Sequence, residues 1–519
     1  MSTILAAAPT WTVRRAGWLA AVSGLASGMA FILPHLGWLL WFTLIPFFVV
    51  VWSADWRWSR LWRLCLAWAL PYNLCGMFFL TQLHSLEWRG LSHTQSLIFA
   101  YGAAWIGGTL VVAPPVLAWG YALYRLRPTG VWRFVTPAAL WVVMEWAQRH
   151  LPLAMPWNLL ALSQIDYPAL VQITAVTGAL GVSALIVAVA NAVALGIVSG
   201  AWPAAMMAVG VAVVNGVAGW AYLATRPVPV PGTGVAVQIL QGNMRPDVNW
   251  QPSLFADMLT TYETMTRGAA RHHPKLIVWP ESALPVDVPH TAWLTQRLQD
   301  LAKETGATLA IGTLETRPEN GRLQNDLGFY DPNGLAIPWY HKRHLVPFGE
   351  YTPGGSVLKP VLLSMGLAAA NTLPSDAMPG DSAAPISVAG MQLGPLICFE
   401  TLFPNVVQES VAAGADVLIE GADDAWFKQS SALAQHNGHA ALRALENHRF
   451  IMRAANTGVS SIIDPYGRVV ATMATNERGT VSGEVWPHRE RTPASRWPDW
   501  WVAASVLVIA VGGWRGRQR

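Results

Sequence analysis

Long apolar runs dominate the first 225 residues of this 519-residue chain, and one more run closes it. A helix that crosses a bilayer needs about 20 predominantly apolar residues. About seven such runs precede residue 226, and another covers residues 499–513. The sequence therefore predicts an α-helical membrane bundle of about eight transmembrane helices. The first seven runs lie near residues 16–33, 36–53, 61–82, 97–123, 132–147, 169–198 and 203–223.

The arginines predict an orientation for this bundle. Eleven of them fall in ends and loops that would share one side of the membrane, whereas the loops of the other side carry only Arg89 and Arg149. By the positive-inside rule, both termini are cytoplasmic and the chain beyond the seventh run lies on the outer side of the membrane. The eleven are Arg14, Arg15, Arg57, Arg60, Arg63, Arg125, Arg127, Arg133, Arg515, Arg517 and Arg519.

A Pro/Gly-rich stretch, RPVPVPGTG, separates the bundle from a region where short β-rich runs alternate with helical ones. This alternation is typical of one α/β domain. The tetrapeptides DPNG at 331–334 and DPYG at 464–467 predict hairpin turns, while ISVAGMQLGPLICFE and IMRAANTGVSSIID are each expected to form one strand. The expected domains are a membrane domain at 1–225, an α/β domain on the outer side at 226–498, and a transmembrane helix with a cytoplasmic tail at 499–519.

The composition limits the classes of partner. Hydrophobic residues make up 53% of the chain and charged residues 12%, as expected for a membrane protein with a soluble part. The formal net charge of +4 is small for this length, and the arginines are not gathered in one basic patch. Nucleic-acid binding is therefore not expected.

Three apolar strands of the α/β region end in a reactive side chain. Glu281 follows LIVW, Lys342 follows IPWYH, and Cys398 follows GPLI. A carboxylate can take the proton of a thiol, and an ammonium can stabilise the oxyanion that forms when the thiolate attacks a carbonyl. Each residue alone also fits a structural role, the cysteine as a buried apolar side chain and the other two as solvated groups. The three contexts together favour acyl transfer.

The stretches LIVWPES, HKRHLVPFGEY and GPLICFETLFP, in this order, resemble the nitrilase superfamily. With the apolar runs and the motifs PWNLLALSQID, QGNMRPDVNW and DDAWF, the whole chain resembles the apolipoprotein N-acyltransferase family, a membrane-embedded branch of that superfamily. This resemblance implies that residues 226–498 form an α/β nitrilase-like α-β-β-α sandwich, the catalytic domain, in the periplasm of a bacterium with the helices in its inner membrane. It also implies Glu281 as general base, Lys342 as the oxyanion-stabilising cation and Cys398 as nucleophile.

The same resemblance implies supporting residues. Glu350 would hold Lys342 and the substrate nitrogen in place, and Phe399 and Glu400 match positions that matter in the family. Three aromatic residues are candidates for substrate binding: Trp250, Trp426 and Phe427. For Trp426 and Phe427 two roles fit equally well, because they either line the acyl entrance or are packing residues.

The implied reaction has two steps. The Cys398 thiolate takes an acyl group from a phospholipid, with phosphatidylethanolamine as the expected donor, and a thioester and a lysophospholipid result. The α-amine of a diacylglyceryl-cysteine at the N-terminus of an apolipoprotein then attacks the thioester, which gives a triacylated lipoprotein. No metal and no cofactor are needed. Three positions depart from the usual family pattern: Phe399 replaces a tyrosine, Asp423 an asparagine and Lys428 a glycine.

Other segments leave alternatives open. Residues 356–374 are apolar but too short and broken to span a bilayer, so they form either a lid at the membrane surface or a buried helix. Glu145 is either an ordinary interfacial acid or a contact of the lipid headgroup. Residues 436–450 predict an amphipathic helix whose charged residues are solvated: Arg443, Glu446 and Arg449.

Rival functions use the same residues. A membrane-tethered amidase of the nitrilase type would pass the acyl group to water, and an inactive paralogue would only bind lipid. A small polar amide needs neither a membrane bundle nor an apolar arm, and an intact Glu, Lys and Cys set argues against the inactive paralogue. A transporter or scaffold is disfavoured because the apolar runs are almost free of charge and the reactive motifs lie outside them.

Overall fold

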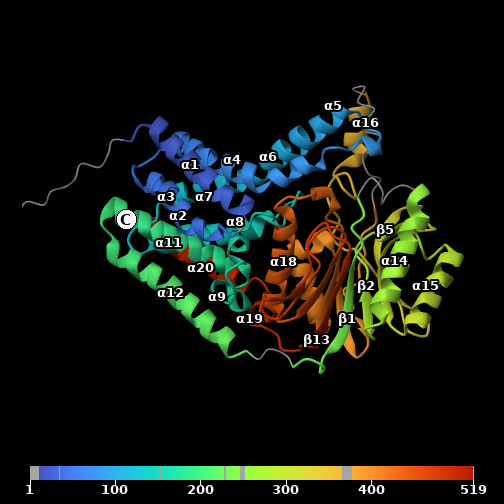
Figure 1. Ribbon diagram of the computed structural model, residues 1–519. Coiled ribbons are helices and arrows are strands. Elements are labelled where there is room, and N and C mark those ends of the chain that lie inside the picture. Colours follow the sequence, from blue (N-terminus) through green and yellow to red (C-terminus); the bar gives the residue numbers. More distant parts are fainter. Residues whose placement is uncertain are drawn as a thin grey trace, which may run out of the picture. The chain divides into compact units, whose positions relative to one another are not determined.

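The computed structural model describes residues 11–33, 35–151, 153–226, 230–245, 252–364 and 377–517. The chain packs as two units (Figure 1). One unit comprises Met1–Thr81, Ala100–Arg226 and Asp499–Arg519, and the other comprises Gln82–Phe99 and Pro227–Pro498. The segment Gln82–Phe99, which connects two apolar stretches, therefore packs with the α/β part of the chain.

Helices build the first unit. Helix α1 packs against α4, α8 contacts both α11 and α20, and α11 also contacts α3 and α12. The α-helices are α1 (Val13–Ile32), α2 (Leu40–Thr43), α3 (Ile45–Trp52), α4 (Trp58–Gly76), α6 (Gly108–Val112), α7 (Pro114–Leu126), α8 (Trp132–Gln148), α9 (Pro168–Val171), α10 (Thr174–Thr177), α11 (Ala179–Ser199), α12 (Trp202–Ala224) and α20 (Trp500–Arg517). Short helical segments are η1 (Gly37–Leu39), η2 (Phe78–Leu83), η4 (Ile98–Gly107) and η5 (Leu160–Gln164).

Small residues let α1 and α4 approach closely. A Cβ on Gly24 would lie 2.1 Å from the carbonyl oxygen of Trp68, and one on Gly28 would lie 2.6 Å from the Cβ of Cys75. Ser23 also lies on the buried side of α1. Close contact through small residues is the usual way in which apolar helices associate without a hydrophobic driving force between them.

Among the described residues, four helical stretches are long and apolar enough to cross a membrane, fewer than the predicted eight. They are Val13–Ile32, His93–Leu126, Ala179–Ser199 and Trp202–Ala224. Other predicted runs are interrupted. The run at 36–53 is divided among η1, α2 and α3, and α4 begins with Arg60 and Arg63 in its first turns. Apolar composition alone therefore overestimates the length of continuous helix.

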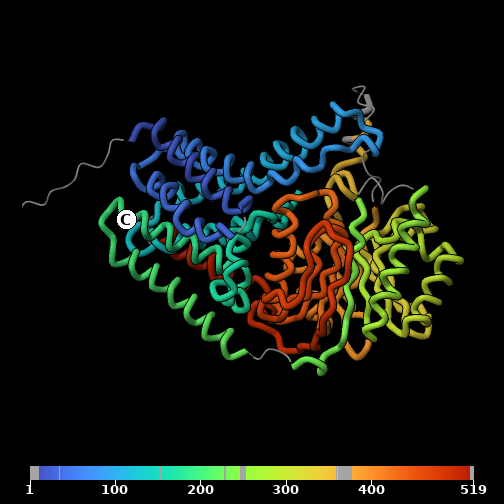
Figure 2. Tube along the Cα trace, in the orientation of Figure 1, coloured from blue at the N-terminus to red at the C-terminus, as the bar shows by residue number. Residues whose placement is uncertain are grey.

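Two β-sheets form the centre of the second unit. In the tube view, β1 (green) runs beside β13 (red), so the end of this part of the chain returns to its beginning (Figure 2). In spatial order, the first sheet holds β13 (Gly479–Val485), β1 (Val235–Gln241), β2 (Leu276–Val278), β4 (Thr308–Thr316), β5 (Leu323–Tyr330) and β6 (Ala336–His341), with β3 (Leu284–Asp287) beside β4. The second sheet holds β12 (Val469–Thr472), β11 (Ser461–Ile463), β10 (Phe450–Ala455), β9 (Val417–Ala422), β8 (Met391–Ile397) and β7 (Ile386–Val388).

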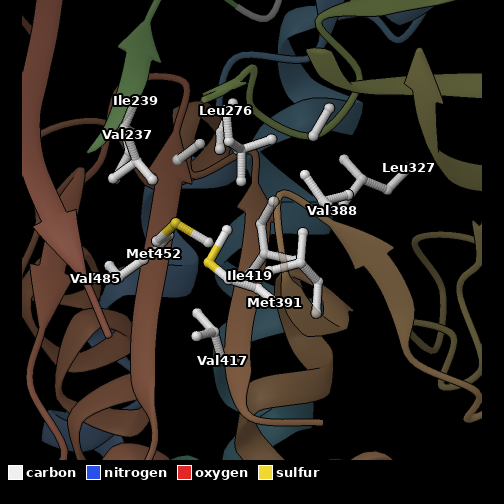
Figure 3. Packing of buried hydrophobic residues seen from close by; sticks show 14 of the residues in the cluster. Val237, Ile239, Leu276, Leu327, Val388, Met391, Val417, Ile419, Met452 and Val485 are labelled. Atoms are coloured by element: carbon white, nitrogen blue, oxygen red, sulfur yellow. The ribbon is translucent and has the colours of Figure 1, made fainter. Parts of the chain in front are cut away.

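The two sheets share one apolar core. Val237 and Leu276 of the first sheet belong to the same buried cluster as Met391, Ile419 and Met452 of the second (Figure 3). Alternate residues of each strand point to this core, as expected for sheets packed face to face. The core holds the ends of strands from different sheets in a fixed relation.

Helices cover the outer faces of both sheets (Figure 1). Helices α14 (Phe255–Ala270) and α15 (Ala292–Thr305) pack on the first sheet through a second apolar cluster. Helices α17 (Pro404–Ala412) and α18 (Ala432–Asn447) contact the second sheet, and α19 (Pro493–Arg496) contacts both of them. The predicted α-β-β-α sandwich is therefore confirmed.

Two predicted single strands are in fact hairpins. ISVAGMQLGPLICFE folds back between β7 and β8 at Ala389 and Gly390, which both have positive φ, and IMRAANTGVSSIID forms the antiparallel pair β10 and β11. The turns predicted at DPNG and DPYG do connect strands, β5 to β6 and β11 to β12. A turn such as that at Ala389 and Gly390 contains no Pro or Asp, so the sequence pattern alone does not predict it.

Candidate active site

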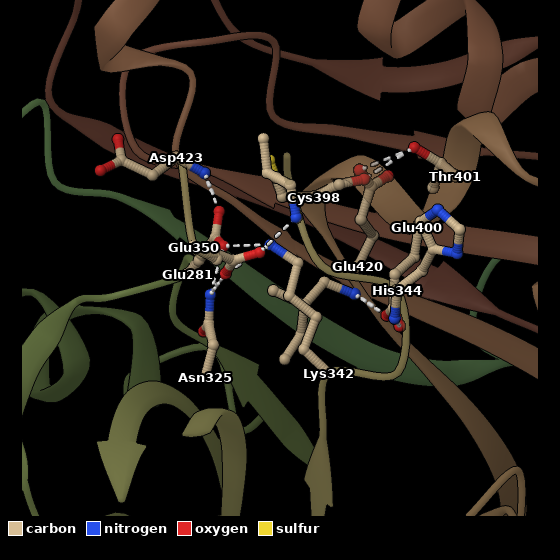
Figure 4. A network of polar contacts seen from close by, with 12 residues as sticks. Glu281, Asn325, Lys342, His344, Glu350, Cys398, Glu400, Thr401, Glu420 and Asp423 are labelled. Carbon is tan, nitrogen blue, oxygen red and sulfur yellow. Dashed lines mark hydrogen bonds and ion pairs between the residues drawn. The ribbon is translucent and has the colours of Figure 1, made fainter. Parts of the chain in front are cut away.

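Strand ends from both sheets deliver the three predicted reactive residues. Glu281 follows β2 of the first sheet, Lys342 directly follows β6 of the same sheet, and Cys398 directly follows β8 of the second. Lys342 Nζ lies 3.1 Å from Glu281 Oε1, and the two side chains are 1% and 7% exposed. In Figure 4 the side chains of Glu281, Lys342 and Glu350 point toward one another, with Cys398 beside them.

Glu350 completes a buried cluster around the ammonium group. Its Oε1 lies 3.0 Å from Lys342 Nζ, and its Oε2 accepts a hydrogen bond of 2.8 Å from the backbone N–H of Val346. Asn325 Nδ2 donates to both Glu281 and Glu350, at 2.7 Å each. No sequence motif pointed to Asn325, because an asparagine inside a strand becomes meaningful only once its neighbours are known.

The electrostatics favour a charged lysine. Burial alone lowers the pKa of Lys342, but the carboxylates of Glu281 and Glu350 outweigh burial and raise it well above its ordinary value. Glu281 also accepts a hydrogen bond of 2.8 Å from the backbone N–H of Asp423. With three donors around it, the Glu281 carboxylate is held as an acceptor at the end of β2.

Cys398 occupies a strained position at the start of η8 (Cys398–Leu402). Its φ of 51° lies in the left-handed region, which a non-glycine residue adopts only when its surroundings hold it there. Burial raises the pKa of the half-buried thiol, the nearby Glu281 carboxylate raises it further, and Lys342 opposes the shift. The resting group is thus a neutral thiol, which requires a base before it can attack.

Glu400 joins the two strand ends rather than standing free beside the thiol. It is fully buried and accepts hydrogen bonds from the Tyr340 hydroxyl at 2.8 and 2.9 Å. Its oxygens also accept from the backbone N–H groups of Arg343 at 2.7 Å, His344 at 3.0 Å and Ile397 at 2.7 Å. Both carboxylate oxygens are therefore used to fasten the end of β6 to the end of β8.

The ring of Phe399 packs in an apolar and aromatic setting. Its centroid lies 5.1 Å from that of Phe403 and 5.9 Å from that of His344, and the side chain is buried. The position can contribute packing but no hydroxyl, in contrast to the tyrosine that the resemblance leads one to expect.

A second buried network holds the backbone of Cys398. His436 Nε2 lies 3.1 Å from the Cys398 carbonyl oxygen, which also accepts from Thr401 Oγ1 at 3.0 Å. His436 Nδ1 lies 2.7 Å from Asp424 Oδ1, and Arg453 donates to Asp424 Oδ2 at 2.7 Å. No sequence motif predicted a role for His436, Asp424 or Arg453. The one available signal was that Asp424 is adjacent to Asp423 in DDAWF.

The predicted solvated face of residues 436–450 is wrong. Arg443 is fully buried and donates to Glu446 at 3.0 Å, and Arg449 is buried and donates to the Ala415 carbonyl at 2.8 Å. The reason is that α18 is covered by α17 and α19 as well as by its sheet. Amphipathic spacing does not distinguish a charged face in water from one in a buried polar network.

The remaining predicted residues have different outcomes. Trp250 lies outside the described residues, as does most of the predicted lid, of which the structure describes α16 (Gly355–Ser364). Trp426 and Phe427 are half-buried in the short turn η9 (Ala425–Phe427). In the first unit, Glu145 is buried and accepts hydrogen bonds from Trp141 Nε1 at 3.1 Å and from the Leu160 N–H at 3.0 Å.

Three groups of side chains in the described residues have atoms close enough to share a metal ion, within 4.8 Å of one another. In each group the side chains already bind one another, as His341 and Asp326 do at 2.7 Å and His93 and Glu87 at 3.0 Å. The groups are His84, Glu87 and His93; Glu315, Asp326 and His341; and Cys398, Asp424 and His436.

Comparison with known proteins defines the class first. The carbon-nitrogen hydrolase family model matches residues 236–501, which include both sheets and the Glu281, Lys342 and Cys398 cluster. A second model, the apolipoprotein N-acyltransferase N-terminal domain, matches residues 23–193. The second unit is thus a carbon-nitrogen hydrolase fold in a chain that also carries apolar helices.

The relatives identify the branch of that class. The apolipoprotein N-acyltransferase of Geobacter metallireducens is 30% identical over 97% of this chain and 96% of its own, and that of Gloeobacter violaceus is 28% identical over 97% and 94%. This chain belongs to the apolipoprotein N-acyltransferase family. Among solved structures, an amidase from Nesterenkonia sp. AN1 aligns at 18% identity over 49% of this chain and 94% of its own, with a TM-score of 0.38.

Proposed function

We propose that the chain transfers a fatty acyl group from a phospholipid, through a thioester on Cys398, to the N-terminal amine of an apolipoprotein. As a member of its family, the chain carries out N-acyl transfer to apolipoproteins, and the amidase alternative is not favoured. The observation that carries the proposed mechanism is the cluster of Glu281, Lys342 and Glu350 beside the half-buried thiol of Cys398.

The first step forms the thioester. Glu281 takes the proton from the Cys398 thiol, and the thiolate attacks the ester carbonyl carbon of the donor. The Lys342 ammonium stabilises the negative oxygen of the tetrahedral intermediate. The ester C–O bond then breaks, and the leaving alkoxide takes the proton from Glu281 and departs as a lysophospholipid. The expected donor is phosphatidylethanolamine.

The second step transfers the acyl group to nitrogen. The α-amine of the diacylglyceryl-cysteine of the acceptor attacks the thioester carbonyl and gives a proton to Glu281. The C–S bond breaks, and the Cys398 sulfur recovers the proton from Glu281, so the resting thiol returns. A thioester suits this step because it is activated toward amines. Glu350 is assigned to hold Lys342 and the entering nitrogen.

Other residues are assigned supporting roles. Glu400 positions the lysine loop against the cysteine loop through its hydrogen bonds to both. Phe399 packs behind the nucleophile. Trp250, Trp426 and Phe427 are assigned to binding of the lipid substrates, because large aromatic side chains suit the boundary between lipid and water.

The membrane arrangement is also part of the proposal. Eight spans arise if the four long apolar stretches are joined by the shorter segment Gly37–Trp52 and by α4, α8 and α20. Both termini then lie in the cytoplasm, and residues 226–498 lie in the periplasm of a bacterial inner membrane. The domain boundaries are 1–225 for the membrane domain, 226–498 for the catalytic domain and 499–519 for the last span and tail.

Intact mass spectrometry tests the mechanism. The purified protein is incubated with phosphatidylethanolamine without an acceptor, and we expect a mass gain of one fatty acyl group. Cys398→Ala should show no gain, whereas the matched variant Cys75→Ala, in the first unit, should behave like the parent. Adding a diacylated lipopeptide should discharge the adduct into an amide. Release of free fatty acid without an adduct would instead indicate a hydrolase.

A further inference from the structure

Arg89 and Arg149 lie in the loops opposite the eleven arginines that predict the cytoplasmic side, and their surroundings in the structure differ. Arg149 forms an ion pair with Asp499, and its side chain is only 9% exposed. Arg89 is exposed, and none of the carboxylates in the described part of the chain pairs with it. One outer arginine is thus neutralised, and the other keeps an uncompensated positive charge.

Arg89 rests on two indole rings. Its guanidinium carbon lies 5.4 Å from the centroid of Trp88 and 5.2 Å from that of Trp426, and the two rings are 5.6 Å apart with 37° between their planes. Stacking on aromatic faces holds a guanidinium in one place while leaving its N–H edges available for a ligand. Trp426 comes three residues after Asp423, whose N–H binds Glu281. A short segment therefore connects this platform to the assigned base.

Lys428 adds a second cation to the same platform. Its Nζ donates to the carbonyl oxygen of His84, which belongs to the Trp88 segment, and its side chain is exposed. The backbone at Lys428 has φ 46° and ψ −133°, a conformation in which only glycine is free of strain. A lysine kept where glycine would relieve strain indicates a use for its side chain.

The position in the chain favours a lipid as the ligand. Arg89 lies between α4 and the apolar stretch His93–Leu126, four residues before a helix that is long enough to cross a membrane. Tryptophan side chains are enriched at the depth of lipid headgroups. A pair of cations there matches the one charge that all glycerophospholipids share, the phosphodiester.

We propose that Arg89 and Lys428, on the platform of Trp88 and Trp426, bind the phosphodiester of the donor phospholipid and so favour phospholipids over esters that lack a phosphate. This inference rests on the proposed function, because it names the part of the acyl donor that the site recognises. Arg89 would bind two phosphate oxygens through its fork, and Lys428 would supply a point charge.

The test compares a donor that has a phosphate with one that lacks it. Acyl-enzyme formation is measured in mixed micelles with phosphatidylethanolamine and, separately, with p-nitrophenyl palmitate, for the parent and for Arg89→Gln, Lys428→Gly and the double variant. We expect the ratio of the two kcat/KM values to fall about tenfold in the double variant, mainly through a higher KM for the phospholipid. Lys428→Gly should also raise the apparent Tm, because it relieves the strained backbone.

Arg496→Gln is the matched control, since Arg496 also lies over an exposed indole, that of Trp497 at 5.9 Å. An unchanged ratio in the double variant, or an equal fall in Arg496→Gln, would overturn the proposal. Glycerophosphoethanolamine should compete with the phospholipid for the parent but not for the double variant. Equal competition by inorganic phosphate would assign the site to free phosphate instead. Failure of the proposed function is distinct, because neither donor would then acylate Cys398 in the parent.

Discussion

The two units bury polar side chains in opposite ways. In the helical unit, Gln164 accepts from Trp41 Nε1 and donates to the Gly37 carbonyl, both at 2.8 Å. In the sandwich unit, the buried groups include full charges, such as Lys342 between two carboxylates and Arg453 between Glu420 and Asp424. Neutral amides tie apolar helices together in the first unit, whereas the sandwich unit buries paired ions, including those at the strand ends of the site.

The difference shows where a protein accepts the cost of burying charge. Removing one partner of a buried ion pair is strongly destabilising, while hydrogen bonds between membrane helices each contribute only about 0.6 kcal/mol on average. Charges are therefore expected where a reaction uses them, and neutral groups where packing alone is required. The following experiments test this contrast, beginning with the largest expected effect.

Replacing the assigned base should have the largest effect. Glu281→Gln keeps the shape of the side chain but removes its ability to take the thiol proton, so thioester formation should fall about 10²–10⁴-fold. The measurement is the rate of acyl-enzyme formation by mass spectrometry. Glu304→Gln, which removes an exposed carboxylate of the same unit, is the control. Near-normal acylation by Glu281→Gln would mean that the buried charges serve stability alone.

The second network should have a smaller effect on the rate. His436→Gln retains a neutral donor but loses the ring that lies between Asp424 and the Cys398 carbonyl, so thioester formation should fall about tenfold. The measurement is the rate of acyl-enzyme formation by mass spectrometry. Thr401→Val removes the other side-chain donor to the same carbonyl and serves as the comparison. An equal fall in both variants would reduce the network to simple backbone support.

Asp423 should make stability depend on pH. Burial, together with the charge of Glu281, raises the pKa of Asp423 from its ordinary 3.8 to about 7. The folded state therefore holds this proton more tightly than the unfolded state, and stability from this group is lost as pH rises from about 4 to 7. Asp423→Asn should raise stability by about 1–3 kcal/mol at pH 8 and have little effect below pH 4.

The check for Asp423→Asn is the apparent unfolding temperature of the detergent-solubilised protein between pH 4 and 8. The amide can still accept from the Ala425 N–H and from Asn456, so these hydrogen bonds are retained. A constant difference across this pH range would contradict the assignment of the ionisable group.

The smallest effect should come from the helical unit. Asn191 accepts from Trp52 Nε1 at 2.7 Å and donates to the Arg133 carbonyl at 2.9 Å. Asn191→Leu should lower the stability of this unit by about 1 kcal/mol and leave the rate of acyl transfer within about twofold. Thermal unfolding and the acylation assay measure the two effects. A loss of activity comparable with that of Glu281→Gln would break the contrast between the units.

Much of the fold could be predicted from the sequence because it follows from local pattern. An α/β domain and its DPNG and DPYG turns were accessible in this way, and the resemblance to the nitrilase superfamily implied the α-β-β-α sandwich. Interruptions were not: the turn at Ala389 lies inside an apolar run, and the run at 36–53 contains three helical segments. Such breaks depend on packing against distant elements, which composition does not record.

The residues of the site also fall into those that the sequence predicts and those that it does not. Glu281, Lys342 and Cys398 could be proposed because each follows a recognisable strand within a family motif. Asn325 and His436 could not, because their importance comes from partners distant in the chain: Asn325 is 44 residues from Glu281, and His436 is 38 residues from Cys398. Arg443 shows the opposite error, since a charge that looked solvated is buried beside Glu446.

The division of the strand ends between two sheets has a consequence for biogenesis. The assigned base and cation follow strands of one sheet, and the nucleophile follows a strand of the other, so they meet only when the sandwich has closed around its core. Under the proposed mechanism, a chain whose sandwich has not closed would hold its thiol apart from Glu281 and Lys342. Such a chain would not cleave the phospholipids that surround it, and assembly itself would protect the membrane.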